Sequence, residues 1–411
     1  MATAAQPGLE LALELMSRVP LIDGHNDWMH MIRAYYDFQV DDRFQPTKDL
    51  AGHVDLKRLV QGRAGAVFWS VYVEWYIVKE HSPEGENDFS DAVHHASMRD
   101  TFQQIDLLQR IMEMYSDRME MAHKAGDVMR IFKSGKCASL MGAEGLHQLG
   151  NSSSVLRIFH RLGVRYVTLA HAKNNLYVDS ATSEAPIHHG LSPQGRDMVR
   201  EMNRIGMIVD LSHVSEKAMV DALDVSLAPV IFSHSSAYAL VPHVRNVPDY
   251  VLDRLKQNRG IIMISFIPWL TNKEPEKATV DNVVDHILHV GNRIGFDHLG
   301  LGSDFDGMPS HVQGLEDVSK YPNIVAAMLQ RGISTENVEK IMGMNVIRVL
   351  REVEDVAASQ KGLLPVLEDA VPQLWDDGIR AYVKKLYPHA EHDRTGASET
   401  TAVEKSIAKD D

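Results

Sequence analysis

The chain has 411 residues, of which 44% are hydrophobic and 24% charged, and its formal net charge is −14 at pH 7. This balance is typical of a globular protein with a large core and excludes a disordered or fibrous chain. The acidic charge, with no dense block of Lys and Arg, argues against binding to nucleic acid or to an anionic membrane surface.

We expect neither end of the chain to carry a targeting signal. The first residues, MATAAQPGLELALELMSRVP, lack the basic and apolar regions of a secretory signal, and the last, TGASETTAVEKSIAKDD, lack a hydrophobic tail for a lipid anchor. No apolar run of about 18 residues occurs. The single cysteine, Cys137, excludes an intramolecular disulfide and fits a reducing compartment. We therefore expect a cytoplasmic protein with no membrane partner.

Eight short apolar runs follow one another along the chain, with longer amphipathic segments between them. This alternation indicates parallel strands covered by helices. The expected strands are Val19–Gly24, Ala66–Val73, Ala138–Gly142, Tyr166–Ala170, Met207–Leu211, Val230–Ser233, Gly260–Phe266 and His298–Gly302. The amphipathic segments include Arg99–Met119, Ser192–Asn203, Ser215–Ala222 and Thr279–Ile294.

Eight strand and helix repeats favour a closed barrel over an open sheet, so we expect an α/β protein with a (β/α)8 TIM barrel. Two further helices are expected after the eighth strand, at Glu316–Arg331 and Ser334–Val356, with Ser334 as an N-cap. The predicted domains are residues 1–388, as a single barrel, and residues 389–411, as a disordered polar tail.

Candidate metal ligands begin at the end of the first strand, in the motif L-I-D-G-H-N-D-W. His25 and Asp27 are two residues apart, so their side chains project to one face of an extended segment and can grip one divalent ion. Taken alone, such a pair also occurs as ordinary structural residues.

Polar residues of ligand type end four more strands, in the motifs M-G-A-E-G, Y-V-T-L-A-H, V-D-L-S-H and V-I-F-S-H. These residues are Glu144, His171, His213 and His234. Because the carboxyl ends of barrel strands meet at one mouth, we expect the side chains to converge there.

The eighth strand ends in L-G-L-G-S-D-F-D-G, which places Asp304 and Asp306 at the same rim. Barrel hydrolases place a catalytic carboxylate here. Asp306 is the rival for this role, although its place before Gly307 also suits a turn. Asp23 and Asp210 are candidate acceptors for the second nitrogen of the histidine ligands.

In order along the chain, these motifs closely resemble those of renal (membrane) dipeptidase, the M19 metallopeptidase family of the amidohydrolase superfamily. The resemblance runs from about Val19 to about Val356 and includes G-L-E-D-V-S-K-Y-P after the eighth strand. It implies a barrel of the metal-dependent hydrolase type and a zinc-dependent dipeptidase with two Zn2+ per subunit. A homodimer is implied by the resemblance alone.

Residue by residue, the resemblance implies that His25, Asp27 and Glu144 hold one zinc, and that Glu144, His213 and His234 hold the second, with Glu144 bridging. Two ions about 3.5–4 Å apart can share a hydroxide, which would attack the peptide carbonyl. Imidazole and carboxylate ligands also accept Mn2+, Co2+ or Fe2+.

The resemblance also assigns three residues that contact the substrate. His171 resembles the histidine that polarises the scissile carbonyl, and Asp304 matches the aspartate that shuttles the proton. Arg245, in H-V-R-N-V-P-D, resembles the clamp for the substrate carboxylate, which would restrict hydrolysis to dipeptides. His147, His188, His189 and His243 are expected to be loop or rim residues.

The chain departs from the secreted mammalian members, which carry a signal peptide, a lipid-anchor signal and paired cysteines. Ile267 stands where relatives often place a tyrosine, so the pocket is expected to be more apolar. The resemblance implies that the substrate is a dipeptide or a peptide conjugate. The sequence does not choose between peptide recycling and cleavage of the Cys-Gly bond in glutathione-derived conjugates.

Two other classes of protein compete with this interpretation. Other barrel amidohydrolases, such as deaminases, lactonases and phosphotriesterases, often bridge their metals with a carbamylated lysine, whereas this chain has Glu144. A catalytically inactive scaffold protein is the other alternative, and retention of the whole predicted set of site residues argues against it.

Overall fold

The structure of the protein is a computed structural model that describes residues 7–45, 47–75, 89 and 91–389. The chain divides into two compact units, Met1–Glu368 and Asp369–Asp411. The predicted boundary between residues 388 and 389 stays a prediction. Nearly all of the predicted polar tail, residues 390–411, lies outside the described residues.

The first unit is built on a closed parallel barrel. Its strands are β1 (Leu21–Asn26), β2 (Ala64–Ser70), β4 (Cys137–Glu144), β5 (Val164–Thr168), β6 (Ile208–Asp210), β7 (Ile231–Ser235), β8 (Ile261–Ser265) and β9 (Leu299–Gly302). They are hydrogen-bonded in the order β2-β1-β9-β8-β7-β6-β5-β4, and the pairing of β2 with β4 closes the ring. The expected (β/α)8 barrel is therefore confirmed.

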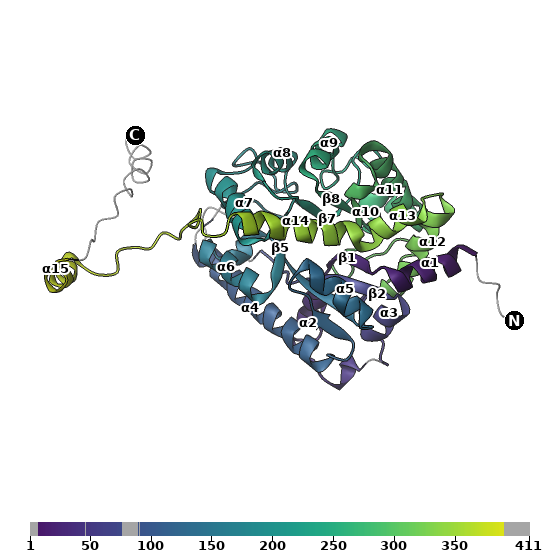
Figure 1. The fold of residues 1–411 in the computed structure, drawn as a ribbon, viewed down its shortest axis with the longest axis horizontal. Helices are drawn as coiled ribbons and strands as arrows, with labels where there is room; N and C mark the ends of the chain where they lie inside the picture. Colours follow the sequence, from purple (N-terminus) through teal and green to yellow (C-terminus); the bar gives the residue numbers. More distant parts are fainter. Residues whose placement is uncertain (1–6, 46, 76–88, 90, 390–411) are drawn as a thin grey trace. The chain divides into compact units, whose positions relative to one another are not determined.

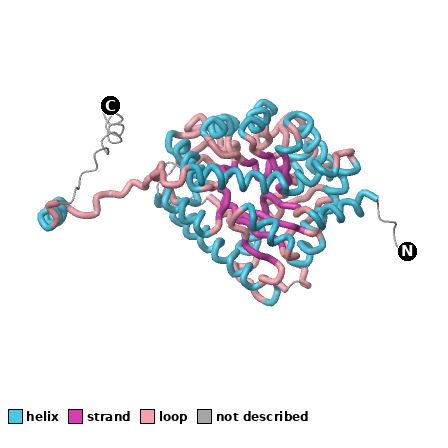
Figure 2. The backbone as a smooth tube through the Cα atoms, in the orientation of Figure 1, coloured by secondary structure: helices cyan, strands magenta, loops and turns pink. Residues whose placement is uncertain are grey.

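Helices surround the strands on all sides of the barrel in Figure 1, and Figure 2 shows the strands enclosed by them. The helices of this unit are α1 (Pro7–Arg18), α2 (Trp28–Tyr35), α3 (Leu56–Gln61), α4 (Asp91–Met114), α5 (Ala125–Lys133), α6 (Ser153–Leu162), α7 (Pro193–Ile205), α8 (Glu216–Val225), α9 (Asp249–Asn258), α10 (Pro268–Thr271), α11 (Val280–Ile294), α12 (Tyr321–Gln330), α13 (Thr335–Glu339) and α14 (Asn345–Ser359).

The apolar core has two parts. One fills the space between the strands and the surrounding helices. The other lies inside the barrel, where Phe68, Leu140 and Met263 pack together, and continues to Ile347 and Leu350 on α14. Helix α14 thus covers the N-terminal end of the barrel and leaves the C-terminal ends of the strands to form a site.

All eight predicted strands are present with small shifts at their ends, but the structure corrects one helix. The segment Arg99–Met119 was expected to be helical throughout, whereas α4 spans Asp91–Met114. Met119 instead begins a short additional strand, β3 (Met119–Met121), which pairs with the start of β4. The apolar spacing in this segment continues past the end of the helix, because strand residues of β3 are also buried or half-buried.

Both predicted C-terminal helices are present, but α12 begins at Tyr321 rather than at Glu316, and the second is divided into α13 and α14. Ser334 caps α13, since its side chain accepts a hydrogen bond from the backbone of Asn337. A π-helical turn, Lys340–Met344, joins α13 to α14. The second unit contains α15 (Asp377–Leu386). No helix in the described part of the chain has the length and apolar character needed to cross a bilayer.

Candidate metal centre

The C-terminal mouth of the barrel gathers the side chains that the sequence predicted. Each lies at the end of a strand or just beyond it: His25 and Asp27 at β1, Glu144 at β4, His171 after β5, His213 after β6, His234 in β7 and Asp304 after β9. Parallel strands direct their carboxyl ends to one rim, which explains why residues so far apart in the sequence meet.

Glu144 lies at the centre of the site, and its two oxygens face different groups. Oε1 is 3.0 Å from Nε2 of His213 and 3.3 Å from Nε2 of His234. Oε2 is 3.6 Å from Nε2 of His25, which in turn lies 3.2 Å from Oδ2 of Asp27. One carboxylate therefore connects a pair of histidines to a histidine and aspartate pair.

The surroundings set the charge of these groups. Burial opposes ionisation of Glu144, but interactions with His25, His171 and His213 outweigh it and hold the pKa of Glu144 well below its usual value. Burial holds the pKa values of His213 and His234 well below the usual range. An ionised carboxylate beside two neutral imidazoles is the protonation state that binds a metal ion.

Tyr166 orients the ring of His25. Its hydroxyl lies 2.8 Å from Nδ1 of His25 and donates to the carbonyl of Gly24 at 3.2 Å. Because a hydroxyl has one hydrogen, Nδ1 is the donor toward Tyr166, and Nε2 faces Glu144. Burial opposes the charge on His25, but interactions with Tyr166, Glu144 and Asp27 outweigh it and raise the pKa of His25 well above its usual value. Gly142 makes this contact sterically feasible, since a Cβ atom there would overlap the ring of Tyr166.

Ser233 orients the ring of His234 in the same way. Its hydroxyl donates to Oδ2 of Asp210 at 2.6 Å and lies 2.8 Å from Nδ1 of His234. The serine hydrogen goes to the carboxylate, so Nδ1 donates to Ser233 and Nε2 keeps its lone pair. The hydroxyl of Thr168 also donates to Asp210, at 2.5 Å, and fixes its position.

The prediction for Asp23 and Asp210 is thus only partly right. Asp210 reaches His234 through Ser233 rather than directly. Asp23 accepts from the hydroxyls of Ser303 and Tyr321, each at 2.6 Å, and from the backbone nitrogen of His25 at 3.3 Å. The ring of His25 contacts Tyr166, which was not among the candidate acceptors, because a tyrosine inside an apolar strand gives no sign of its contact.

Two site residues adopt an uncommon backbone conformation. His213 and Asp304 have φ values of 69° and 63°, in the left-handed region that costs a non-glycine residue about 1–3 kcal/mol and is enriched at functional sites. The backbone nitrogen of Asp304 donates to the carbonyl of His25 at 3.0 Å. Its Oδ1 then lies 3.7 Å from Nε2 of His25.

Asp306 has a different environment from Asp304. Its Oδ1 accepts from the backbone nitrogen of His53 at 2.5 Å, and its own nitrogen donates to Nδ1 of His53 at 3.0 Å. Both aspartates line the same cavity. One oxygen of Asp306 is therefore engaged with the loop that carries His53, while its buried Oδ2 has no partner among the described residues. Asp304 lies 3.7 Å from His25, so the geometry favours Asp304 as the carboxylate next to the metal-type ligands.

A cavity of about 460 Å³ opens in front of Glu144, and Arg245 is buried in its wall. Nη1 of Arg245 has no hydrogen-bond partner among the described residues. Burial lowers the pKa of Arg245 to about 10, so the guanidinium stays charged at neutral pH. A buried cation with an unpaired donor favours an anionic group in the cavity.

His171 lines the same cavity between two other rings. Its centroid lies 4.6 Å from that of Tyr72 and 4.4 Å from that of His213. The hydroxyl of Ser180 donates to the carbonyl of His171 and holds its loop. Burial lowers the pKa of His171, so the ring is neutral and offers one N–H donor.

An apolar wall completes the cavity. It consists of Ile267, Trp269 and Leu270, at the start of α10. Ile267 is 3% exposed and Trp269 is 36% exposed, so the wall runs from the interior to the rim. Ile267 therefore lines the cavity, and the expectation of a pocket more apolar than in relatives stays a prediction.

The donor atoms fit a metal ion. Three groups have ligand atoms that lie within 4.8 Å of one another: His25 with Asp27 and Glu144, Glu144 with His171 and His213, and His25 with His234 and Asp304. Nε2 of His25 and Oδ1 of Asp27 are buried without a hydrogen-bond partner among the described residues. Leaving such atoms unpaired is costly, and a divalent cation would satisfy both.

Ser233→Ala is expected to weaken metal binding by about 10–100-fold, because His234 would lose the acceptor that fixes its ring. Metal affinity can be measured by competition with a chromophoric chelator. Ser236→Ala is the matched control, since Ser236 is buried nearby but bonds to Ser265 at 3.0 Å. Equal affinities of the two variants would contradict the role assigned to Ser233.

The histidines that were expected to be loop or rim residues lie outside the three donor groups, although His147 is buried. Nε2 of His147 contacts the carbonyl of Val73 at 2.9 Å, and Nε2 of His188 contacts the carbonyl of Asn175 at 2.8 Å. His243 lines the rim of the cavity.

Sequence reasoning missed Tyr72, Tyr166 and Ser233. Only Ser233 carried a signal, because a Ser-His pair follows β6 and another lies near the end of β7. In the folded protein, the two serines of these pairs lie 3.3 Å apart.

Comparison with known proteins identifies the family. The family model described as membrane dipeptidase (peptidase family M19) matches residues 9–362. Dipeptidase tcpJ of Claviceps purpurea (strain 20.1) is 90% identical, with all of both chains covered. Dipeptidase verJ of Clonostachys rogersoniana is 47% identical over 92% of this chain and 95% of its own.

Two solved structures are similar to this chain. A metallopeptidase from Rhodobacter sphaeroides, crystallised with a phosphinate mimic of the dipeptide L-Ala-D-Ala, is 26% identical, with a TM-score of 0.70, over 82% of this chain and 99% of its own. A probable dipeptidase from Pseudomonas aeruginosa shares the fold at a TM-score of 0.76, with 23% identity over 86% of this chain and 100% of its own. The predicted family is thus confirmed: the chain belongs to the membrane dipeptidase family, peptidase family M19, and is a dipeptidase of the metallopeptidase type.

Proposed function

We propose that the protein is a zinc-dependent dipeptidase with two metal ions per subunit, whose substrates include the Cys-Gly unit of glutathione-derived conjugates. The observation that carries the proposal is the position of Glu144, whose two oxygens face separate groups of ligand atoms. The same cavity contains the buried, incompletely paired cation of Arg245. A metal centre and a carboxylate-binding site side by side fit a small peptide with a free C-terminus.

In this proposal His25, Asp27 and Glu144 hold one ion, and Glu144, His213 and His234 hold the other. When bound, such ions supply Lewis acidity toward the scissile carbonyl and lower the pKa of water. Zinc is favoured by the imidazole and carboxylate donors, which also accept Mn2+, Co2+ or Fe2+.

Three side chains of the cavity would act on the peptide itself. Asp304 accepts the proton of the attacking water at its carboxylate and delivers it to the leaving amine. The neutral ring of His171 donates its N–H to the carbonyl oxygen as negative charge develops there, an interaction often worth about 3–4 kcal/mol. Arg245 binds the C-terminal carboxylate and so positions the peptide bond.

The apolar wall supports the choice of conjugates among dipeptides. Ile267, Trp269 and Leu270 offer an aromatic and aliphatic surface in the cavity that also contains Arg245. A thioether substituent on the cysteine of Cys-Gly would bury apolar area against this wall, while the glycine carboxylate of the same substrate binds the guanidinium of Arg245.

The direct test is a hydrolysis panel with zinc-loaded protein. The panel contains L-L and L-D dipeptides, Cys-Gly, S-benzyl-Cys-Gly, a tripeptide and simple lactones. We expect dipeptide turnover, with S-benzyl-Cys-Gly preferred over Cys-Gly, and little turnover of the tripeptide. Lactone turnover without dipeptide turnover would overturn the proposal, and so would tight dipeptide binding without hydrolysis. Loading with Mn2+, Co2+ or Fe2+ in parallel tests the choice of zinc.

Arg245→Gln is expected to lower kcat/KM for dipeptides by about 100-fold, since a charged hydrogen bond to the substrate carboxylate is lost. Substrates with a C-terminal amide lack that carboxylate, so wild type and variant should cleave them at similar low rates. Arg157→Gln is the control, because Arg157 pairs with Glu201 at 2.9 Å, between α6 and α7 and outside the cavity. An equal loss on acid and amide substrates would contradict the clamp.

Two further proposals concern the cellular setting. The single cysteine, Cys137, fits a reducing compartment, so we place the protein in the cytoplasm. The family resemblance suggests a homodimer. Cell fractionation and light scattering test the two proposals separately.

A further inference from the structure

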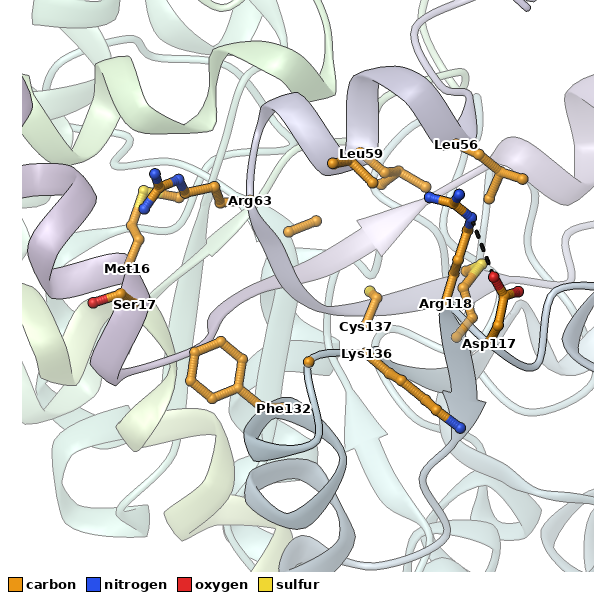
Figure 3. Close-up of a pocket in the computed structure, with 14 residues that line it drawn as sticks. Met16, Ser17, Leu56, Leu59, Arg63, Asp117, Arg118, Phe132, Lys136 and Cys137 are labelled. Carbon is orange, nitrogen blue, oxygen red and sulfur yellow. Dashed lines mark ion pairs between the residues drawn. The ribbon is translucent and has the colours of Figure 1, made fainter. Parts of the chain in front are cut away.

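A second hollow lies at the opposite end of the barrel from the metal centre. It has a volume of about 620 Å³, larger than the active-site cavity of about 460 Å³. Figure 3 shows it around Cys137, the first residue of β4. Glu144 ends the same strand, seven residues after Cys137. At about 3.3 Å per residue, the two residues are about 23 Å apart. The hollow is therefore separate from the dipeptidase site.

The inner surface of this hollow is apolar. Met16, Leu59 and Met119 line it and are almost fully buried. Figure 3 places Cys137 near the centre of the view, with Phe132 on one side and Leu59 on the other. Burial raises the pKa of Cys137 to about 12, so its thiol adds no charge at neutral pH. The volume is within the range of about 300–1,000 Å³ that is typical of small-molecule sites.

Three cations stand around this apolar surface, although the protein as a whole carries a net charge of −14. They are Arg63, Arg118 and Lys136, and Asp117 is the only carboxylate among the lining residues described. In Figure 3, Arg63 lies on one side of Cys137, and Arg118 lies on the other. The hollow is thus a local positive region on an acidic protein.

These cations are poorly neutralised. Arg63 donates to the backbone carbonyl of Leu13 at 3.0 Å and has no ion pair among the described residues. Arg118 lies 3.6 Å from the carboxylate of Asp117, its neighbour in the chain. Lys136 lies 3.6 Å from Glu120.

The carboxylate near Lys136 is also shared. Glu120 makes a closer bond, at 2.7 Å, to Arg130. For comparison, the surface ion pair between Arg331 and Asp285 is also 2.7 Å long, whereas the two ion pairs at the hollow are each 3.6 Å long. Both pairs in the hollow exceed hydrogen-bond distance, so its cations retain capacity to bind an anion.

We propose that this hollow binds a small amphiphilic anion, namely a carboxylate with an unbranched or aromatic apolar body. The apolar body packs against Met119, Phe132 and Cys137. The carboxylate lies at the rim, where Arg63, Arg118 or Lys136 pairs with it. An uncharged apolar molecule would leave the rim cations without an anionic partner, and a purely polar anion would leave the apolar surface exposed to water.

Decanoate is the probe that tests the proposal, and Cys137 reports on it because the chain has one cysteine. The rate at which methyl methanethiosulfonate modifies Cys137 is followed by intact-protein mass spectrometry on the full-length, metal-loaded enzyme. We expect decanoate to slow the reaction by about tenfold at ten times its Kd. Decanol, which has the same chain without the charge, should protect at least several-fold less.

The triple variant Arg63→Gln, Arg118→Gln, Lys136→Gln should bind decanoate about tenfold more weakly, because three partly exposed cations are lost. Lys133→Gln is the control, since Lys133 is on α5 next to the lining residue Phe132 but does not itself line the hollow. Unchanged dipeptide hydrolysis by the triple variant would show that it is folded. Absence of protection in the wild type, or equal protection by decanoate in the triple variant, would overturn the proposal.

Discussion

Replacing Glu144 with Gln is expected to abolish binding of at least one metal ion and to lower kcat/KM for dipeptides by at least about 1,000-fold. Its two oxygens lie 3.0 Å from His213 and 3.6 Å from His25, so one substitution affects both groups of ligand atoms. An amide offers one oxygen and no charge, and cannot offset two close cations. A loss of about 4 kcal/mol in transition-state stabilisation corresponds to that factor.

The measurement combines metal content by mass spectrometry with hydrolysis of a dipeptide. Glu201→Gln is the matched control, because Glu201 is a buried glutamate that pairs with Arg157 and Arg204 away from the cavity. We expect the control to retain two metal equivalents and most of its activity. Circular dichroism checks that both variants are folded. Full metal content in Glu144→Gln would show that Glu144 is not a metal ligand. The proposed function would then lose its central observation.

The barrel was predictable because its signal is repeated. Eight apolar runs each end in a polar residue or a turn, and an error in one run leaves the count and the order intact. The missed strand β3 has three residues, and its pairing with β4 depends on a turn between α4 and β3 that the apolar spacing conceals. Strand existence was therefore easier to predict than the end of the helix before it.

The position of the candidate site and the residues that meet there were predictable. His25, Asp27, Glu144, His213 and His234 all follow apolar runs, and barrel geometry brings such positions together. Their hydrogen-bond partners were harder to predict. The ring of His25 contacts Tyr166, which is 141 residues away and has the composition of an ordinary core residue. A contact made across the barrel interior leaves no local pattern in the sequence.

Asp304→Asn is expected to lower kcat for dipeptides by about 100–10,000-fold with little change in metal content. The Oδ1 atom of Asp304 lies 3.7 Å from Nε2 of His25, and the side chain lines the cavity beside Glu144, where it can reach the attacking water. Proton transfer by a positioned side chain contributes about that factor, and an amide cannot accept or deliver the proton. Asparagine has nearly the same size, so the backbone conformation at φ 63° should persist.

Asp306→Asn separates this role from a general effect of lost negative charge. Asp306 shares the strained turn, with φ 68°, and lines the same cavity, but its Oδ1 accepts a hydrogen bond from His53 that an asparagine oxygen can also accept. We expect less than about a tenfold loss in kcat for this variant, below the range for a group that transfers a proton. If the two variants lost activity equally, proton transfer could not be assigned to Asp304. A larger loss in Asp306→Asn would reverse the assignment, because the carboxylate nearer to His25 would then be dispensable for the chemistry.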